Sequence, residues 1–288
     1  MAQAKYIPYR EVAGVLELRA GDTVLLTSDI LKLAMKAKKQ EKEFDTVQFI
    51  QSFVNTIGPV GNILIPAYNF DLEEGDAFDM QKTMPMTGSL GIAALNDKAF
   101  VRTWHPLHSF LVKGKDASGL ASMRNVSSFG IDSPFAWMHE RNALMVFAGT
   151  TPAEAMTFTH FVEEAEQVWY RRYKDLQIRY TDVEGNTSIK RFRIYAKKAG
   201  WTMRMQKLEK LFSDDRLRHY DINGLDFYSI RCKDAYDVIS RDIRENNAQS
   251  IAAFSMKLYF RDILKLWLRR FNLFRTTYGK IRSAKRIH

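Results

Sequence analysis

The sequence predicts an α/β protein with crossover helices. Short apolar, β-branched runs alternate with helical stretches, turns rich in glycine and proline separate them, and no repeat or low-complexity linker interrupts the alternation. With 46% hydrophobic and 26% charged residues among 288, the composition is that of a globular protein and excludes a disordered or collagen-like chain. Strands that alternate with helices favour a sheet built through crossover connections.

The first half of the chain carries the clearest alternation. A short N-terminal helix is expected first, and Thr23–Leu26 is an apolar run typical of a buried strand. The helical stretch that follows is expected to break at the charged segment 36–42 and to resume over Phe44–Ile57. The turn over Gly58–Gly61 ends this helix, and Asn62–Pro66 is the next strand.

A β-hairpin is predicted in the second half. Leu176–Val183 and Thr187–Tyr195 flank Glu184-Gly185-Asn186, a composition typical of a short hairpin loop. The other expected elements are an acidic loop over Asp71–Asp79, helices over Leu90–Asn96, Lys233–Glu245 and Ser250 to about Phe274, and strands over Ser109–Val112 and Ala143–Phe147. We therefore expect one domain over residues 1–250, followed by a helix and tail over 251–288.

The positive charge is concentrated at the C-terminal end. Asp262 is the only acid there, against ten basic residues: Lys257, Arg261, Lys265, Arg269, Arg270, Arg275, Lys280, Arg282, Lys285 and Arg286. Ten minus one gives +9 for these last residues, so the net charge of +10 leaves about +1 for the body.

The expected C-terminal helix combines this charge with apolar surface. Lys257, Arg261, Lys265 and Arg269 recur every four residues, and Trp267 is among the apolar residues between them. Such a helix is a candidate for lying on an anionic membrane surface. It could equally pack on the body with its basic stripe in water. Nucleic acid is the least favoured partner, because no recognised reader motif accompanies the charge.

The single cysteine, Cys232, excludes an internal disulfide and a Cys-based zinc site. The N-terminal residues show no signal-peptide pattern, and no run of eighteen uncharged apolar residues occurs. We expect a cytoplasmic protein, with attachment to the inner face of the cell membrane as the alternative. The sequence does not predict an oligomeric state.

A helix start is marked by three signals at Thr151-Pro152-Ala153-Glu154: an N-cap threonine, a proline at the first helical position and a glutamate that completes a capping box. Downstream, His160 and Glu163 are three residues apart and share one helix face. A carboxylate there can fix the imidazole tautomer, which makes the pair a plausible general base. A solvated helix face is the alternative that spacing alone favours.

Two loop clusters are weaker candidates. His105-Pro106 and His108 suggest metal ligands, but the intervening proline argues against a helical pair and no further ligand is near, so no metal is predicted. Ser127-Ser128, ahead of Gly130 and Ser133-Pro134, could cradle a phosphate or be a turn with an N-cap serine. Walker, dinucleotide-binding and G-x-S-x-G signatures are missing.

The order of these motifs resembles the aminoglycoside 3-N-acetyltransferase family, chiefly over residues 12–175. The landmarks are Gly21-Asp22-Thr23-Val24-Leu25-Leu26, Gly58-Pro59-Val60-Gly61-Asn62-Ile63-Leu64-Ile65-Pro66, Phe78-Asp79 with Thr87-Gly88, His105-Pro106 with Ser109-Phe110, Gly130 with Ser133-Pro134, and Thr157 to Glu163. The resemblance implies a three-layer α/β/α sandwich that uses acetyl-coenzyme A, or another acyl-coenzyme A, without a metal.

The resemblance also implies roles for particular residues. His160 matches the family's catalytic histidine and Glu163 its carboxylate partner, and attack by the acceptor would be direct. The residues expected on the acyl-donor side are His105, Ser109, Ser128, and Thr27 with Ser28, whose backbone N–H groups would stabilise the oxyanion. The chain departs from the family where the first strand ends in Thr27-Ser28-Asp29-Ile30.

The acceptor is predicted to be an amino group of an amino sugar in a surface-polysaccharide pathway. A true aminoglycoside acetyltransferase that confers resistance is the first alternative, and a non-catalytic membrane-surface protein with an acetyltransferase-like body is the second. Asp71, Asp79 and Glu164 are the carboxylates predicted to bind the acceptor.

Overall fold

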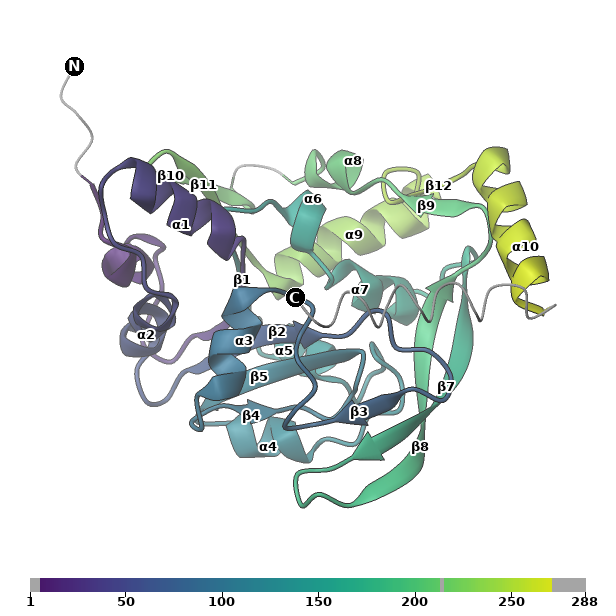
Figure 1. Ribbon diagram of the computed structural model, residues 1–288. Coiled ribbons are helices and arrows are strands. Elements are labelled where there is room, and N and C mark those ends of the chain that lie inside the picture. Colours follow the sequence, from purple (N-terminus) through teal and green to yellow (C-terminus); the bar gives the residue numbers. More distant parts are fainter. Residues whose placement is uncertain (1–5, 213–214, 271–288) are drawn as a thin grey trace.

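A computed structural model describes residues 6–212 and 215–270 (Figure 1). Its main sheet has seven strands in the order β10-β11-β6-β1-β2-β5-β4. The three central strands are parallel to one another, and the strands on both sides of them are antiparallel. In chain order the strands are β1 Thr23–Ser28, β2 Asn62–Tyr68, β4 Val101–Arg102, β5 His108–Gly114, β6 Leu144–Ala148, β10 Arg218–Ile222 and β11 Leu225–Arg231.

Helices cover both faces of this sheet, which confirms the predicted three-layer α/β/α sandwich. Strand residues alternate between the faces, so Val24 and Leu26 point into one core while Leu25 points into the other. The first core is closed by the 3-10 helix η1 Tyr9–Val15 and the helices α1 Ile30–Lys39, α2 Thr46–Ile57 and α3 Ser89–Asn96. The second is closed by α4 Ala117–Ser122, α5 Pro134–Glu140, α7 Thr159–Ala165 and α9 Cys232–Asn246.

The chain leaves the centre of the sheet in two directions. From β1 it crosses to β2 on one side, and β6 lies on the other side of β1. Such a switch in strand order opens a crevice outside the carboxyl ends of the strands, where open α/β sheets bind ligands. Ser28 and Ala148 end the two strands at this point.

The predicted hairpin is longer than expected and forms a separate small sheet. Strand β7 Arg171–Thr181 pairs with β8 Thr187–Lys197 on one side and, on the other, with β3 Ala77–Asp79, a short strand inside the expected acidic loop. Figure 1 shows β7 and β8 as a long ribbon beside the body. Strand β7 begins at Arg171, five residues before the predicted strand. This first residue of the strand is buried against the body.

Two helix predictions need correction. Helix α1 continues through Lys39, so the charged segment does not break it where expected; the basic side chains of its last turn suit a helix C-terminus. The capping box at Thr151 is present, but it starts only the single turn α6 Pro152–Ala155. His160 and Glu163 belong to the separate helix α7.

The C-terminal part begins inside the body. Strand β9 Trp201–Met203 pairs with β12 Ala252–Phe254. The short helix α8 Met205–Glu209 follows β9 in the chain. Ile251 and Ala252 are buried in the second core, so the division expected at residue 250 falls just ahead of a strand that packs with the body. Helix α10 Met256–Arg270 follows, and residues 271–274 of the predicted helix lie outside the described residues. None of the helices described is long and apolar enough to cross a membrane.

Candidate active site

The histidine and the glutamate predicted as a pair are in contact on α7. His160 Nδ1 lies 2.7 Å from Glu163 Oε2, and the side chain of the histidine is 27% exposed while that of the glutamate is fully buried. The Tyr170 hydroxyl donates a 2.7 Å hydrogen bond to Glu163 Oε1. The carboxylate is thus held from behind, and one edge of the imidazole remains accessible.

Arg171, the first residue of β7, contacts both members of the pair. Its Nη2 lies 2.7 Å from Glu163 Oε2 and 2.9 Å from His160 Nδ1, and its Nη1 donates to the Tyr195 carbonyl at 2.7 Å. A guanidinium has only donors, and an ionised carboxylate only acceptors. When Nδ1–H donates to Glu163, the proton of the neutral imidazole sits on Nδ1, the Nε2 lone pair is free, and the approach of Arg171 Nη2 to Nδ1 is a contact without a hydrogen bond.

These charges set the protonation states of the pair. Burial, and then the charge of Arg171, lower the pKa of His160. Burial acts to raise the pKa of Glu163, but the hydrogen bond and charge of His160 and the charge of Arg171 outweigh it, so the net pKa is lowered. At neutral pH the arrangement is therefore a neutral imidazole beside an ionised carboxylate, which is the state a general base requires.

A second, buried network joins the two loop clusters of the sequence. The Leu107 N–H donates to His105 Nδ1 at 3.3 Å, which places the His105 proton on Nε2, 3.2 Å from Ser128 Oγ. The same His105 Nε2 lies 3.3 Å from the Arg193 carbonyl, and the Ser128 hydroxyl lies 2.9 Å from His108 Nδ1. Burial lowers the pKa of His105 to about 3 and, with the nearby His105, also that of His108. Both rings are thus neutral.

Ser109 has a role inside the sheet. Its hydroxyl is fully buried, donates to the Ala67 carbonyl at 2.8 Å and accepts from Arg102 Nε at 2.9 Å. These bonds secure β5 against β2. The placement gives no support to the predicted contact between this hydroxyl and the acyl donor.

Thr27 and Ser28 lie at the switch in strand order between β2 and β6. They end β1 opposite Phe147 and Ala148 of β6, and the carboxylate of Asp29 caps α1 directly after them. The Ser28 hydroxyl is buried and finds no hydrogen-bond partner among the described residues. A buried polar group without a partner is costly, so this hydroxyl suits contact with a ligand.

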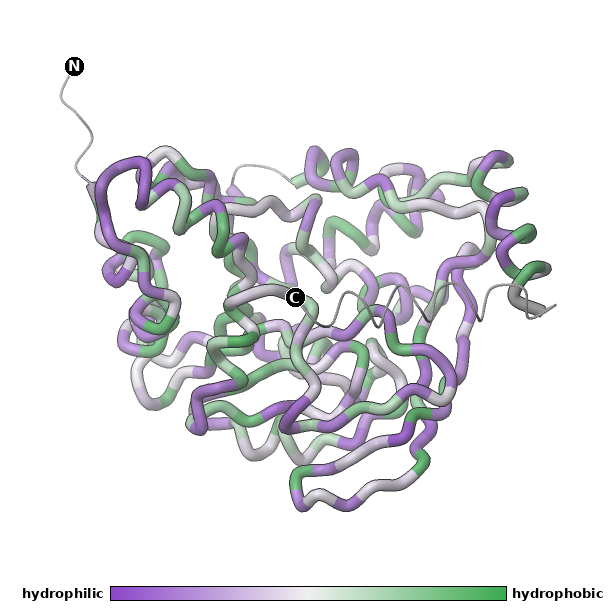
Figure 2. Tube along the Cα trace, viewed as in Figure 1, coloured by the Kyte–Doolittle hydropathy of each residue, from purple (hydrophilic) through white to green (hydrophobic). Residues whose placement is uncertain are grey.

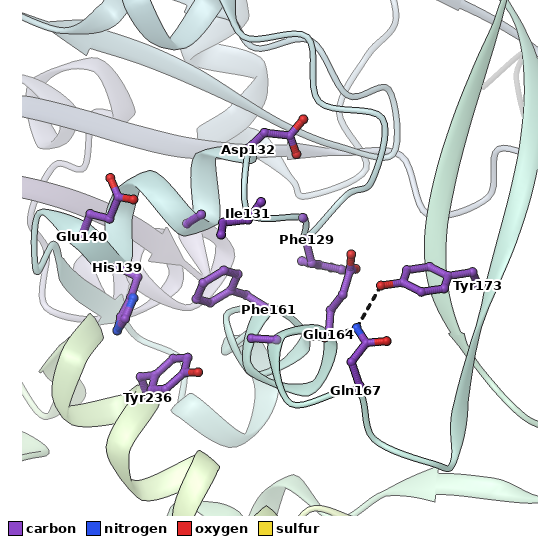
Figure 3. A pocket seen from close by; sticks show the side chains of 13 residues that line it. Phe129, Ile131, Asp132, His139, Glu140, Phe161, Glu164, Gln167, Tyr173 and Tyr236 are labelled. Carbon is purple, nitrogen blue, oxygen red and sulfur yellow. Dashed lines mark hydrogen bonds between the residues drawn. The ribbon is translucent and has the colours of Figure 1, made fainter.

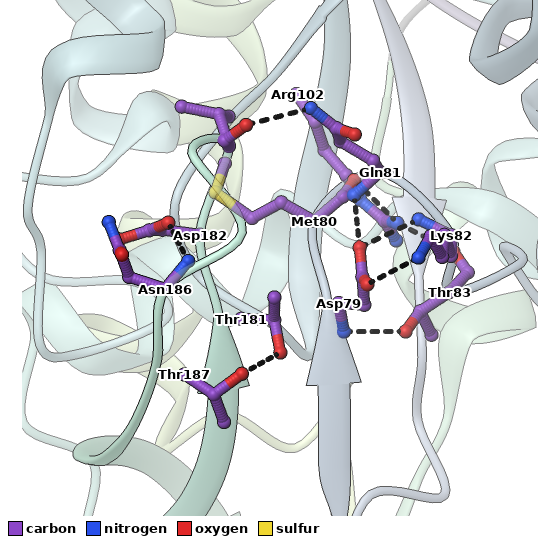
Figure 4. Close-up of polar contacts among 11 residues, drawn as sticks. Asp79, Met80, Gln81, Lys82, Thr83, Arg102, Thr181, Asp182, Asn186 and Thr187 are labelled. Atoms are coloured by element: carbon purple, nitrogen blue, oxygen red, sulfur yellow. Dashed lines mark hydrogen bonds and ion pairs between the residues drawn. The ribbon is translucent and has the colours of Figure 1, made fainter.

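Two carboxylates of the acidic loop already accept hydrogen bonds from backbone N–H groups. The carboxylate of Asp79 accepts from the backbone N–H groups of Gln81 and Lys82 and lies 4.0 Å from the Lys82 ammonium (Figure 4). Glu74 accepts from the backbone N–H of Gln177 on β7. Asp71 is exposed. The carboxylate of Asp79 thus stabilises a turn, and its predicted contact with the acceptor finds no support here.

Glu164, by contrast, lines a pocket of about 590 Å³ (Figure 3). Asp132 and Glu140 are its other carboxylates, and neither lysine nor arginine is among its described lining residues. Glu164 Oε1 accepts a 2.6 Å hydrogen bond from Ser127, and burial raises the pKa of this carboxyl. The pocket wall also includes the ring of Phe129, which packs against the His160 ring with centroids 5.6 Å apart.

Two other chemistries, metal-assisted and thiol-based catalysis, require different groups. In the described part of the chain, no three His, Cys, Asp or Glu side chains come together as metal ligands. Cys232 is buried at the start of α9, and burial raises the pKa of its thiol. A buried, protonated thiol is a poor nucleophile.

The family's sequence profile, described as aminoglycoside 3-N-acetyltransferase, matches residues 34–243. The chain belongs to this family. The match confirms the resemblance inferred from the order of the motifs and the predicted class of enzyme, an N-acetyltransferase that takes its acyl group from coenzyme A. No curated protein matches the chain in sequence.

Solved structures of aminoglycoside acetyltransferases share the fold. AAC(3)-Xa is 18% identical, with a TM-score of 0.68 over 82% of this chain and 91% of its own. AAC-IIIb, solved as a binary complex with CoASH, is 16% identical, with a TM-score of 0.71 over 84% and 98%. AAC-VIa bound to sisomicin is 15% identical, with a TM-score of 0.70 over 84% and 99%. At these identities the likeness shows the fold.

Three side chains around the pair were not predicted from the sequence in the positions they occupy. Tyr170 and Arg171 stand just before the predicted hairpin strand, and His108 was considered only as a metal ligand. The run Trp169-Tyr170-Arg171-Arg172 carries two basic residues at the start of a strand, and this was the available signal. Only the tertiary fold shows that the first arginine turns inward, to 7% exposure, while Arg172 stays exposed.

Proposed function

We propose that this enzyme transfers an acetyl group from coenzyme A to an amino group of a cationic amino sugar, with His160 as the general base. The observation that carries the proposal is the accessible imidazole of His160, backed by the buried carboxylate of Glu163 at 2.7 Å. This arrangement supplies an unprotonated Nε2 at neutral pH and a fixed tautomer.

The chemistry follows from these protonation states. As the acceptor nitrogen forms its bond to the thioester carbonyl carbon, His160 Nε2 takes the proton of the amine. The ionised Glu163 stabilises the resulting imidazolium, to which it is already hydrogen-bonded. When the C–S bond breaks, the proton returns from the imidazolium to the leaving sulfur. No acyl-enzyme is needed, and the buried Cys232 offers no accessible nucleophile.

The donor is proposed to lie in the crevice outside β1 and β6. The unpartnered Ser28 hydroxyl is a group that a bound thioester would satisfy. Backbone N–H groups near Thr27 and Ser28 are the proposed oxyanion donors on this side. The Nε2 of His108, in the tautomer that carries the proton there, is a further candidate donor, because the rings of His108 and His160 both pack on Phe129.

The acceptor is proposed to bind in the acidic pocket. Asp132, Glu140 and Glu164 give it a negative charge, and Tyr236 and Phe161 give it aromatic walls. This environment attracts a sugar with several protonated amino groups and disfavours an anionic nucleotide-linked sugar. An acceptor of the aminoglycoside type thus fits the pocket better than an anionic amino-sugar precursor of a surface polysaccharide.

A thiol-release assay with acetyl-coenzyme A tests this function. We expect release with aminoglycosides or other polyamino sugars, and little with neutral or nucleotide-linked amino sugars. His160→Ala should lose about 100-fold to 10,000-fold in rate. His219→Ala is the matched control, because His219 is exposed and pairs with Asp226 on β11. Release with no amine at all, or full activity of His160→Ala, contradicts the proposal.

A further inference from the structure

The contacts given by the described residues attach one side of helix α10 to the body. The Gly200 N–H donates to Asp262 Oδ2 at 3.1 Å. Gly200 has a φ of +84°, and a Cβ at this position would lie 2.6 Å from the Phe254 ring and 2.8 Å from Tyr259 Cβ. The helix therefore sits tightly on the turn between β8 and β9 at its base, and in Figure 1 it projects at the edge of the molecule (yellow).

An apolar face of α10 points away from this attachment. At 100° per residue, Met256, Phe260, Ile263, Leu264 and Trp267 fall within one arc of the helix. Their exposed fractions range from 42% for Ile263 to 64% for Phe260. In Figure 2 hydrophobic and hydrophilic positions alternate along the tube of this helix. Large side chains grouped in this way on a surface mark an interaction site.

Basic side chains border this face. Lys257 lies at its edge, and Arg261 and Lys265 follow at a spacing of four residues, in a row that turns gradually away from the apolar arc. All three are exposed. Asp262, the only acid of the helix, points to Gly200 and is paired with Arg261 at 2.9 Å. The surface that α10 offers is therefore cationic as well as apolar.

We propose that α10 docks the protein on an anionic phospholipid membrane, with its apolar face in the interface. A helix with Trp, Phe and Leu on one face and Lys and Arg beside it has the two features that bind such a surface. A second copy of this chain would bring two cationic faces together, and nucleic acid would leave the apolar residues without a partner. The charge and the apolar face together therefore favour lipid.

This surface is separate from the proposed active site. None of the residues assigned above to the base, the donor crevice or the acceptor pocket lies on α10. Membrane docking and acetyl transfer can therefore fail independently, and thiol release with a soluble acceptor reports only the second.

The test is sedimentation of the full-length protein with vesicles. We expect binding to vesicles of phosphatidylcholine with phosphatidylglycerol, weakening with added salt, and little binding to pure phosphatidylcholine. The double variant Phe260→Asp, Trp267→Asp and the double variant Lys257→Glu, Arg261→Glu should each lower the partition coefficient by about tenfold or more. The control is Val183→Asp with Ile189→Asp, which adds the same charge to exposed apolar residues of the hairpin and should bind as the parent does.

Unchanged thiol release and melting temperature show that the variants are folded. Equal binding to neutral vesicles, or full binding by both α10 variants, overturns the proposal. A third result would also overturn the proposal: the parent is a dimer by sedimentation velocity, and the Phe260→Asp, Trp267→Asp variant is a monomer that binds vesicles as the parent does.

Discussion

Glu163 is fully buried and its partner His160, 2.7 Å away, keeps 27% of its side chain exposed. The pair therefore has a closed end and an open end. Tyr170 and Arg171 occupy the closed end through the two carboxylate oxygens, so the Nδ1–H of His160 has a fixed acceptor. Only the opposite ring nitrogen is left for a substrate, and this polarity is what the proposed role of His160 as a base requires.

The first prediction ranks the two members of the pair. His160→Ala should lower kcat by about 100-fold to 10,000-fold, because no base remains. Glu163→Gln should cost less, because a glutamine oxygen can still accept the Nδ1–H but carries no charge to stabilise the imidazolium. Steady-state thiol release measures both variants. A larger loss for Glu163→Gln than for His160→Ala, in folded protein, would contradict the assignment of the base.

The second prediction concerns Arg171 and pH. Its charge, together with burial, lowers the pKa of His160. Arg171→Met removes a positive charge and leaves Glu163 unneutralised, and both changes raise that pKa. The proposed base works only when it is neutral. With a raised pKa of His160, the activity of Arg171→Met should therefore be lost at a higher pH than that of the parent when the pH is lowered.

The measurement for Arg171 is the acid limb of kcat/KM against pH. Arg172→Met serves as the matched control, since Arg172 is the neighbouring exposed arginine on the same strand. Its profile should overlay that of the parent. An acid limb of Arg171→Met that stays in place or moves to lower pH would show that this arginine does not tune the base.

The central sheet could be predicted because its strands are short apolar runs. Thr23–Leu26, Asn62–Pro66 and Ala143–Phe147 each lie within an observed strand or extend it by one residue. Strands β10 and β11 extend the sheet in the antiparallel direction, and sequence periodicity could not show this. Their residues are a mixture of exposed, half-buried and buried positions, which also suits a peripheral hairpin. The end of α1 was missed because a run of lysines at a helix C-terminus resembles a break.

The site was predictable where it depends on local spacing. His160 and Glu163 meet because three residues bring two side chains onto one helix face. Arg171 comes from the next element, and its inward position depends on how β7 meets α7. Asp79 was predicted to bind the acceptor because it lies in an acidic loop. In the structure its carboxylate accepts hydrogen bonds from the backbone N–H groups of Gln81 and Lys82, which the sequence does not reveal.

The third prediction is that Cys232 takes no part in the reaction. The thiol is fully buried at the start of α9, and burial raises its pKa. Iodoacetamide at pH 8 should therefore leave the native enzyme active, and the thiol should react only after unfolding. Cys232→Ala should retain kcat within a few fold while lowering the melting temperature, because it removes a buried sulfur from the core. Rapid inactivation of native enzyme by iodoacetamide, prevented by Cys232→Ala, would contradict this.

The fourth prediction separates the acidic pocket from the acidic loop. Glu164→Gln removes a carboxylate from the pocket wall, while its Ser127 partner can still donate to the amide oxygen. We expect the KM for a polyamino sugar to rise about tenfold, as for the loss of one charge-assisted contact, with a smaller change in kcat. Asp71→Asn makes the same change of charge in the exposed loop and should leave KM unchanged. If Asp71→Asn raises KM and Glu164→Gln does not, the acceptor binds at the loop, and the pocket beside Phe129 is not its site.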